Sequence, residues 1–367
     1  MKSNGKDQEN NQIIELTFAE VTISSSLDKI DSTTFNTDDA CQIIHIPAHI
    51  TSIDPCTFDR YLSLRSIIVD SDNEYFTSID GILFSKDKHR LIRHPPQHPN
   101  KEYMIPSSVT TIDSCAFYHC FMLKRICLEN GNSAFVSIED SIFSKDMRTL
   151  ICYQSRHTNS IFTIPPSVTS IDNSAFTCTN DITSITIPSS VISIGQKAFA
   201  GCKKLEQISV ENGNSAFISI EGILFSKDMQ TLVCYPSCHC NSIYNIPPSV
   251  KSIGDYSFYY CQNLKSITIP SSVLSIGCKT FYCCDKLSSI DIPFRISSIG
   301  EYAISCCSKL TSITIPSSVI TIGHHAFSKC RKLKRISVEN DNSAFVSIER
   351  ILFSKDMQTL ICHPSWH

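Results

Sequence analysis

The sequence predicts a repeat solenoid, in which β-rich coils stack on one another and share a parallel β-ladder. Three observations lead to this fold class. An apolar pattern recurs along nearly the whole chain, at intervals of either 23 or 36 residues. Within each recurrence, apolar and hydroxyl side chains alternate, as they do in a strand with one buried face. A proline follows this strand directly in most of the short recurrences, which is where a ladder strand would end.

The repeat can be followed from one fixed position, the apolar residue that ends the strand, which we call the phase residue. The phase residues are Ile23, Ile46, Val69, Ile105, Leu128, Ile164, Ile187, Val210, Ile246, Ile269, Ile292, Ile315 and Val338. They define about thirteen coils, nine of them short and four of them long. The long coils start near Val69, Leu128, Val210 and Val338. Because a single coil cannot cover its own apolar side chains, neighbouring coils must stack.

The coil around Ile269 illustrates a short coil. Residues 266–269 alternate Ser, Ile, Thr and Ile and are expected to form a strand of the ladder. Gly277 lies eight residues after the phase residue, where it suits a tight turn. An Ala-Phe pair, such as Ala198-Phe199, then begins a compact piece that we expect to be one helical turn.

Each long coil carries an additional segment with the pattern of a β-hairpin. In the coil that starts at Val210, the apolar runs Ile223–Phe225 and Leu232–Cys234 flank the sequence Ser-Lys-Asp-Met-Gln. Two short apolar runs around a polar turn are typical of a hairpin. We expect these hairpins to project from one side of the solenoid.

The unbroken phase indicates a single solenoid domain over residues 13–367, preceded by a polar, disordered tail at residues 1–12. Residues 13–45 form a degenerate first coil, as expected of a cap. The chain ends at His367, seven positions before the next phase residue would fall, which predicts an unfinished C-terminal edge.

The chain contains 19 cysteines, and six of them lie fifteen residues after a phase residue. These six are Cys120, Cys202, Cys261, Cys284, Cys307 and Cys330. We expect them to form a column inside the coils, where a free cysteine behaves as a small apolar residue. Coils about 4.8 Å apart would permit disulfides between neighbours. The parallel side-chain directions and the missing signal peptide favour free thiols instead.

The pattern LxxIxIPxSVxxIGxxAFxxC, clearest at Leu264–Cys284 and Leu310–Cys330, resembles the BspA-like class of leucine-rich repeat. The long coil, with its SIEGILFSKDMQTLVCYP sequence, is similar to the longer repeat interspersed in the same proteins. The resemblance implies a right-handed, leucine-rich-repeat-like β-rich coil with a parallel β-ladder, short helical turns and projecting β-hairpins. It also implies a surface antigen of bacterial or protist type that adheres to host cells and matrix proteins, without a catalytic motif. Serine stands where ordinary leucine-rich repeats carry Asn or Cys, at Ser108, Ser190, Ser272 and Ser318.

No sequence feature points to catalysis, to a cofactor or to a bound metal ion. A phosphate-binding loop, a nucleophile elbow and an H-E-x-x-H pattern are all missing from the sequence. Four histidines lie 29 residues after a long-coil phase residue: His98, His157, His239 and His367. They belong to coils too far apart to share one ion. The cluster Cys234, Cys238, His239 and Cys240 lacks a standard zinc spacing, so we predict no metal site and no cofactor.

The outward face of the ladder is the remaining candidate for function. Its polar side chains alternate with the buried isoleucines, at Ser184, Thr186, Ser266, Thr268, Ser289, Asp291, Ser312 and Thr314. This row is either a solvated β face or a docking surface, as in other repeat solenoids, with the hairpins as a second candidate surface. We predict a non-enzymatic protein-binding or adhesion module of the surface-antigen type. The alternative is an intracellular protein-interaction scaffold that uses the same face.

Composition limits the class of partner. The net charge is −3, the isoelectric point is about 6.4 and no basic stripe is present, so we expect no nucleic-acid partner. No apolar run approaches 18 residues, so we expect no membrane insertion. The expected partner is a protein, either a host matrix or cell-surface protein or an intracellular one, and self-association through the unfinished C-terminal edge is a further expectation. The resemblance favours the cell surface, whereas the polar N-terminus, which lacks a signal-peptide core, favours the cytoplasm.

Overall fold

The computed structural model describes residues 15–364, except 18–19, 32–33, 35–39, 55, 121, 140, 154–159, 177–178, 180 and 201. The chain divides into two compact units, Met1–Asp146 and Met147–His367, and each contains several coils. The expected tail at residues 1–12 lies outside the described residues. The assignment of residues 13–367 to one solenoid domain stays a prediction.

The first unit contains short strands and one 3₁₀ helix among its described residues. Its elements are β1 (Glu15–Thr17), β2 (Glu20–Thr22), β3 (Lys29–Ile30), β4 (Ile43–Ile46), β5 (Ser52–Ile53), η1 (Thr57–Arg60), β6 (Ser66–Val69), β7 (Phe76–Ile79), β8 (Ile82–Ser85), β9 (Arg90–Arg93), β10 (Glu102–Ile105), β11 (Thr111–Ile112), β12 (Arg125–Leu128), β13 (Phe135–Ile138) and β14 (Ser141–Ser144). The sheets run in the orders β1-β2-β4-β6, β10-β12, β3-β5 and β11-β9-β8-β7, and β13 pairs with β14.

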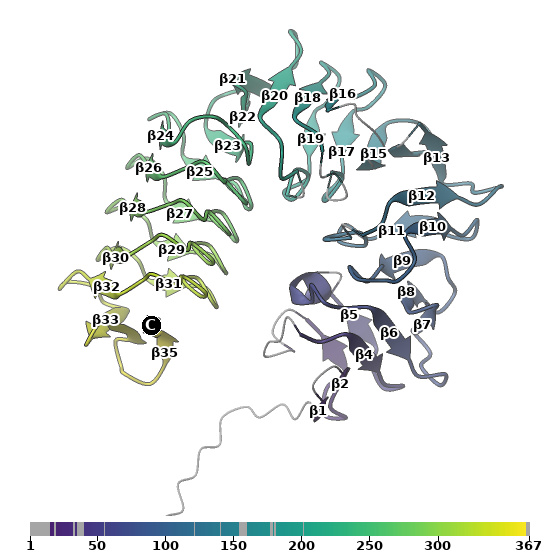
Figure 1. The fold of residues 1–367 in the computed structure, drawn as a ribbon, viewed down its shortest axis with the longest axis horizontal. Coiled ribbons are helices and arrows are strands. Elements are labelled where there is room, and N and C mark those ends of the chain that lie inside the picture. Colours follow the sequence, from purple (N-terminus) through teal and green to yellow (C-terminus); the bar gives the residue numbers. More distant parts are fainter. Residues whose placement is uncertain are drawn as a thin grey trace, which may run out of the picture. The chain divides into compact units, whose positions relative to one another are not determined.

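The second unit repeats this organisation. Its strands are β15 (Thr149–Tyr153), β16 (Ile161–Thr163), β17 (Ser170–Ile171), β18 (Ser184–Ile187), β19 (Ser193–Ile194), β20 (Gln207–Val210), β21 (Phe217–Ile220), β22 (Ile223–Ser226), β23 (Thr231–Cys234), β24 (Ile243–Asn245), β25 (Ser252–Ile253), β26 (Ser266–Thr268), β27 (Ser275–Ile276), β28 (Ser289–Asp291), β29 (Ser298–Ile299), β30 (Ser312–Ile315), β31 (Thr321–Ile322), β32 (Arg335–Val338), β33 (Phe345–Ile348), β34 (Ile351–Ser354) and β35 (Leu360–Cys362). Figure 1 shows the strands from β24 to β32 stacked in successive coils.

Each short coil contributes strands to two parallel ladders. The first, which we call the phase ladder, contains the strands at the phase residues. In it Ile267 of β26 lies opposite Ile290 of β28, 23 residues later. The second ladder contains two-residue strands such as β27, in which Ile276 lies opposite Ile299 of β29. The predicted parallel ladder is confirmed, and the second ladder is an addition that the sequence pattern did not predict.

Apolar side chains from successive coils fill the space between the two ladders. The Phe258 and Phe281 rings, for example, stack with their centroids 5.1 Å apart. The six cysteines of the predicted column are all buried. Each donates its thiol hydrogen to the carbonyl oxygen 26 residues earlier, as Cys284 does to Phe258 at 3.1 Å and Cys330 does to Ile304 at 3.0 Å. Burial raises the pKa of the Cys202 thiol to about 12, and the described cysteines are free thiols.

The predicted hairpins are present, and their strands also pair with further strands. In the coil that starts at Val210, β22 pairs antiparallel with β23 at the two apolar runs, as predicted. The upstream strand β21 also pairs with β22, and β23 continues into the second ladder through β25. The strand β22 is therefore a central strand of this sheet. Residues 223–225 are buried because β22 has a neighbouring strand on each side.

Helical turns are also rarer than expected. The only helix among the described residues is η1, and the compact pieces after the second ladder are otherwise hydrogen-bonded turns. In these pieces the backbone of one coil often bonds to the next, as Phe258 N does to Thr280 O. Such hydrogen bonds join the turns of neighbouring coils.

A buried asparagine locks each long coil to the coil before it. In the coil that starts at Val210, Asn214 donates from Nδ2 to the carbonyl oxygens of Pro188 and Val191, both at 2.9 Å. Its Oδ1 accepts hydrogen bonds from the backbone of Ala216 and Phe217. The same four contacts recur at Asn73, Asn132 and Asn342. All four side chains are buried and fully hydrogen-bonded, so they are structural residues.

Candidate binding face

The phase ladder of the second unit aligns its outward side chains in rows. Parallel pairing places Thr268 opposite Asp291, and Ser266 opposite Ser289. Because paired residues in a parallel ladder point to the same side of the sheet, each row continues across neighbouring coils. In the next sheet, Ser312 and Thr314 occupy the corresponding positions of β30.

Exposure along these rows mostly follows the sequence prediction. Five predicted residues are exposed: Thr268, Ser289, Asp291, Ser312 and Thr314. Thr186 and Ser266 are half-buried. Ser184 is a correction, because only 8% of it is exposed. It lies in one row between Ile161 and Gln207, whose longer side chains flank the small serine on both sides.

The same row contains an apolar member that the sequence pattern did not predict. Ile243 lies opposite Ser266 and is 65% exposed. An isoleucine in an alternating strand resembles a core residue, and only its place in the register shows that it points outward. We define the binding face as Ile243, Ser266, Thr268, Ser289, Asp291, Ser312 and Thr314.

The phase ladder is interrupted within this face. The strand β28 ends one sheet and β30 begins the next, so the two strands are not joined by ladder pairing. A cleft of about 170 Å³ lies at this interruption. Its polar lining comes from Ser288, Ser289, Asp291, Ser312, Thr314 and Glu339. Four hydroxyl groups and two carboxylates converge here, which suits a cationic or hydrogen-bond-donating group.

The histidines that the sequence aligned are structural where the structure describes them. Nε2 of His98 donates to the carbonyl oxygen of Asp80, and Nε2 of His239 donates to that of Glu221, at 2.8 and 2.9 Å. Nδ1 of His239 accepts a hydrogen bond from the backbone of Asn241. Each histidine therefore holds the turn that joins the first two strands of a long-coil sheet. His157 and His367 lie outside the described residues.

The clustered cysteines near His239 also make separate contacts. Cys238 donates to the carbonyl oxygen of Lys203, Cys240 contacts the side chain of Asn241, and Cys234 is buried. Among the described residues, the metal-type donors that converge include none of these side chains.

Comparison with known proteins identifies the repeat. The model of the BspA type leucine-rich repeat region (6 copies) matches residues 10–93, 99–160, 150–233 and 230–358. No curated protein matches the chain. These matches together cover almost the whole chain, so the repeat dominates its sequence.

Among the solved structures, the pneumococcal vaccine antigen PcpA supports this fold. The pneumococcal vaccine antigen PcpA is 22% identical with a TM-score of 0.50, over 89% of this chain and 69% of PcpA. A leucine-rich repeat protein from Eubacterium ventriosum ATCC 27560 is 19% identical with a TM-score of 0.45, over 88% and 82% of the two chains. A leucine-rich cell surface protein from Faecalibacterium prausnitzii A2-165 is 19% identical with a TM-score of 0.44, over the full length of both.

Proposed function

The chain belongs to the BspA-type leucine-rich repeat family, and we propose that it acts as a protein-binding module of the surface-antigen type. Proteins built on this repeat are generally non-enzymatic. The proposed partner is a host matrix or cell-surface protein, which docks on the binding face. Within the described residues, no helix has the length and apolarity needed to span a membrane.

The cleft between β28 and β30 is the observation that carries this proposal. It interrupts an otherwise regular polar face and brings Asp291 and Glu339 to one depression. A lysine or arginine side chain of the partner would find carboxylate and hydroxyl acceptors there. The exposed Ile243 lies on the same face, two strands away on β24, and supplies apolar contact area there.

A binding assay with matched variants tests the proposal. The full chain is titrated against immobilised, purified extracellular matrix proteins, and the double variant Thr268→Arg, Thr314→Arg is compared with wild type. The control is Ser275→Arg, Thr321→Arg, which adds the same charge to exposed positions of the second ladder in the same two coils. We expect the first variant to bind at least tenfold more weakly, about 1.4 kcal/mol, and the control to bind as wild type does.

Two outcomes would contradict the proposal. One is equal binding by both double variants, which would show that the partner does not dock on the binding face. The other is no binding of wild type to any matrix protein in the panel. Protease treatment of intact cells tests display at the surface, since a chain on the surface is cleaved and a chain inside the cell is protected.

A further inference from the structure

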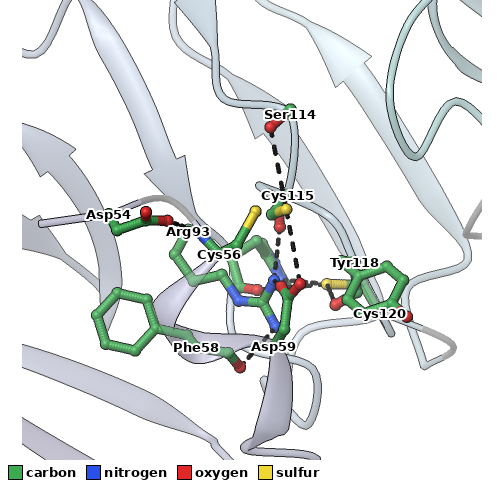
Figure 2. Close-up of polar contacts among 10 residues, drawn as sticks. Asp54, Cys56, Phe58, Asp59, Arg93, Ser114, Cys115, Tyr118 and Cys120 are labelled. Carbon is green, nitrogen blue, oxygen red and sulfur yellow. Dashed lines mark hydrogen bonds and ion pairs between the residues drawn. The ribbon is translucent and has the colours of Figure 1, made fainter. Parts of the chain in front are cut away.

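A second group of chemically active side chains lies in the first unit, far along the sequence from the binding face. Sγ of Cys56, Sγ of Cys115 and a carboxylate oxygen of Asp59 all lie within 4.8 Å of one another. Figure 2 shows the three side chains turned toward one another, with Arg93 beside them. Cys115 Sγ donates a hydrogen bond to Asp59 Oδ2 at 3.7 Å.

The repeat itself brings these residues together. Cys56 lies ten residues after Ile46, and Cys115 lies ten residues after Ile105. They therefore occupy the same position in two short coils that are separated by one long coil. Asp59 is fixed on η1, whose N-cap residue is Cys56, and Asp54 Oδ1 accepts a hydrogen bond from the Cys56 backbone.

The long coil between them contributes Arg93, whose side chain is fully buried. Nη1 donates to the carbonyl oxygen of Cys115 at 2.5 Å, and Nη2 donates to that of Phe58 at 3.3 Å. Nη1 also lies 3.6 Å from Asp59 Oδ1. The corresponding residue of the other long coils is a cysteine, at Cys152, Cys234 and Cys362. No other short coil has an acidic residue at the position of Asp59, so this charged pair is particular to one place in the chain.

The spacing of the donor atoms fits a tetrahedral metal ion. Zinc binds thiolate sulfur at about 2.3 Å and carboxylate oxygen at about 2.0 Å, so tetrahedral angles place sulfur about 3.5 Å from oxygen and about 3.8 Å from a second sulfur. The 3.7 Å between Cys115 Sγ and Asp59 Oδ2 agrees with the first distance. Since all three atoms lie within 4.8 Å, small side-chain rotations complete the arrangement.

We propose that Cys56, Asp59 and Cys115 bind a zinc-type divalent cation, with a water molecule in the fourth position. Two thiolates and one carboxylate form a donor set of the kind that selects zinc or cobalt over magnesium and calcium. Cys56 is only half-buried, so the cation reaches the cluster from its side. Arg93 is a positioning residue, because it holds Oδ1 of Asp59 and leaves Oδ2 to the metal.

Charge balance explains how such a buried site can accept a cation. Without metal, the Arg93 cation balances the Asp59 carboxylate and the two thiols are neutral. With metal, two positive charges on the ion and one on Arg93 balance two thiolates and one carboxylate. Binding thus exchanges one divalent cation for two protons, and the cluster is neutral in both states.

Cobalt titration of the full chain, reduced and under anaerobic conditions, tests this site. We expect one equivalent of Co²⁺ to bind with a sulfur-to-cobalt charge-transfer band and to release close to two protons into a weakly buffered indicator solution. Zinc should displace the cobalt and remove the band. Cys56→Ser and Cys115→Ser should each weaken binding at least tenfold.

Control variants separate the outcomes. Cys240→Ser removes the exposed cysteine of the other cluster and should leave the titration unchanged. Cys56→Ser changes one atom at a half-exposed position, and an unchanged circular dichroism spectrum would show that it folds. A folded Cys56→Ser variant with wild-type cobalt affinity would overturn the proposal, as would a band lost in Cys240→Ser or the lack of any thiolate band in wild type.

Discussion

Asn214 tests how the long coils are locked to their neighbours. The variant Asn214→Ala loses four hydrogen bonds, two to the backbone of the preceding coil and two to the start of β21. A hydrogen bond contributes about 1 kcal/mol net, so we expect the local free energy of unfolding to fall by about 4 kcal/mol. Asn214→Asp should be no better. It keeps the acceptor oxygen but turns a second oxygen toward the carbonyl groups of Pro188 and Val191.

Native-state hydrogen exchange at the Ala216 and Phe217 amides measures this loss. Both amides bond to Asn214 Oδ1, and exchange reports one coil even when a repeat array does not unfold as a single unit. The matched control is Asn212→Ala, because Asn212 is exposed and two residues away. We expect the control to lie within about 0.5 kcal/mol of wild type. Equal exchange free energies at these amides in the two variants would show that Asn214 does not lock the coil.

Three further predictions concern other contacts. Asp59→Asn leaves the buried Arg93 without a counter-ion and should lower the free energy of urea unfolding by about 3–5 kcal/mol. The double variant Asp59→Ser, Arg93→Cys carries residues found at these positions in other coils and should recover most of that loss. Equal losses in both variants would count against the ion pair. Burial lowers the pKa of His94 to about 3. Below about pH 6.5, His94 therefore binds a proton in the unfolded chain but not in the folded chain. The free energy of unfolding should fall by about 1.4 kcal/mol per pH unit from pH 6.5 toward pH 3, and less steeply in His94→Gln. Identical pH profiles of wild type and His94→Gln would contradict this prediction. Arg350 has a φ of +74°, and the corresponding residue of the coil that starts at Val210 is Gly222, with a φ of +81°. Arg350→Gly should therefore add about 1 kcal/mol to the free energy of unfolding. A lower melting temperature of this variant would exclude backbone strain at Arg350.

The repeat made the main features of the fold predictable from sequence. Apolar residues at fixed intervals identify the stacked positions, so the phase ladder, the cysteine column and the hairpin at residues 223–234 were all foreseen. The second ladder was not predicted, because strands of two residues, such as Ser275–Ile276, are too short to show alternation. The pairing of the hairpin strands with β21 and β25 was not predicted either, although the continuous apolar run Ile223–Phe225 is the pattern of a strand covered on both faces.

The candidate sites were predictable only in part. Alternation correctly placed Thr268 and Thr314 on the outside, but it could not show that longer neighbours cover Ser184. The cluster around Cys56 and Cys115 was missed because 59 residues separate the two cysteines, and their approach depends on how the intervening long coil folds. The sequence nevertheless contains a sign of this cluster, since Arg93 stands where the other long coils have a cysteine.

The dissociation constant of the Asp291→Arg variant for the bound matrix protein tests the proposed binding face most directly. Asp291 lines the cleft between β28 and β30, and the substitution replaces an acceptor for a basic group with a cation. The control is Asp285→Arg, which makes the same charge change at an exposed position that does not line the cleft. We predict at least tenfold weaker binding by Asp291→Arg and an unchanged constant for Asp285→Arg. Equal constants for the two variants would contradict recognition through this face.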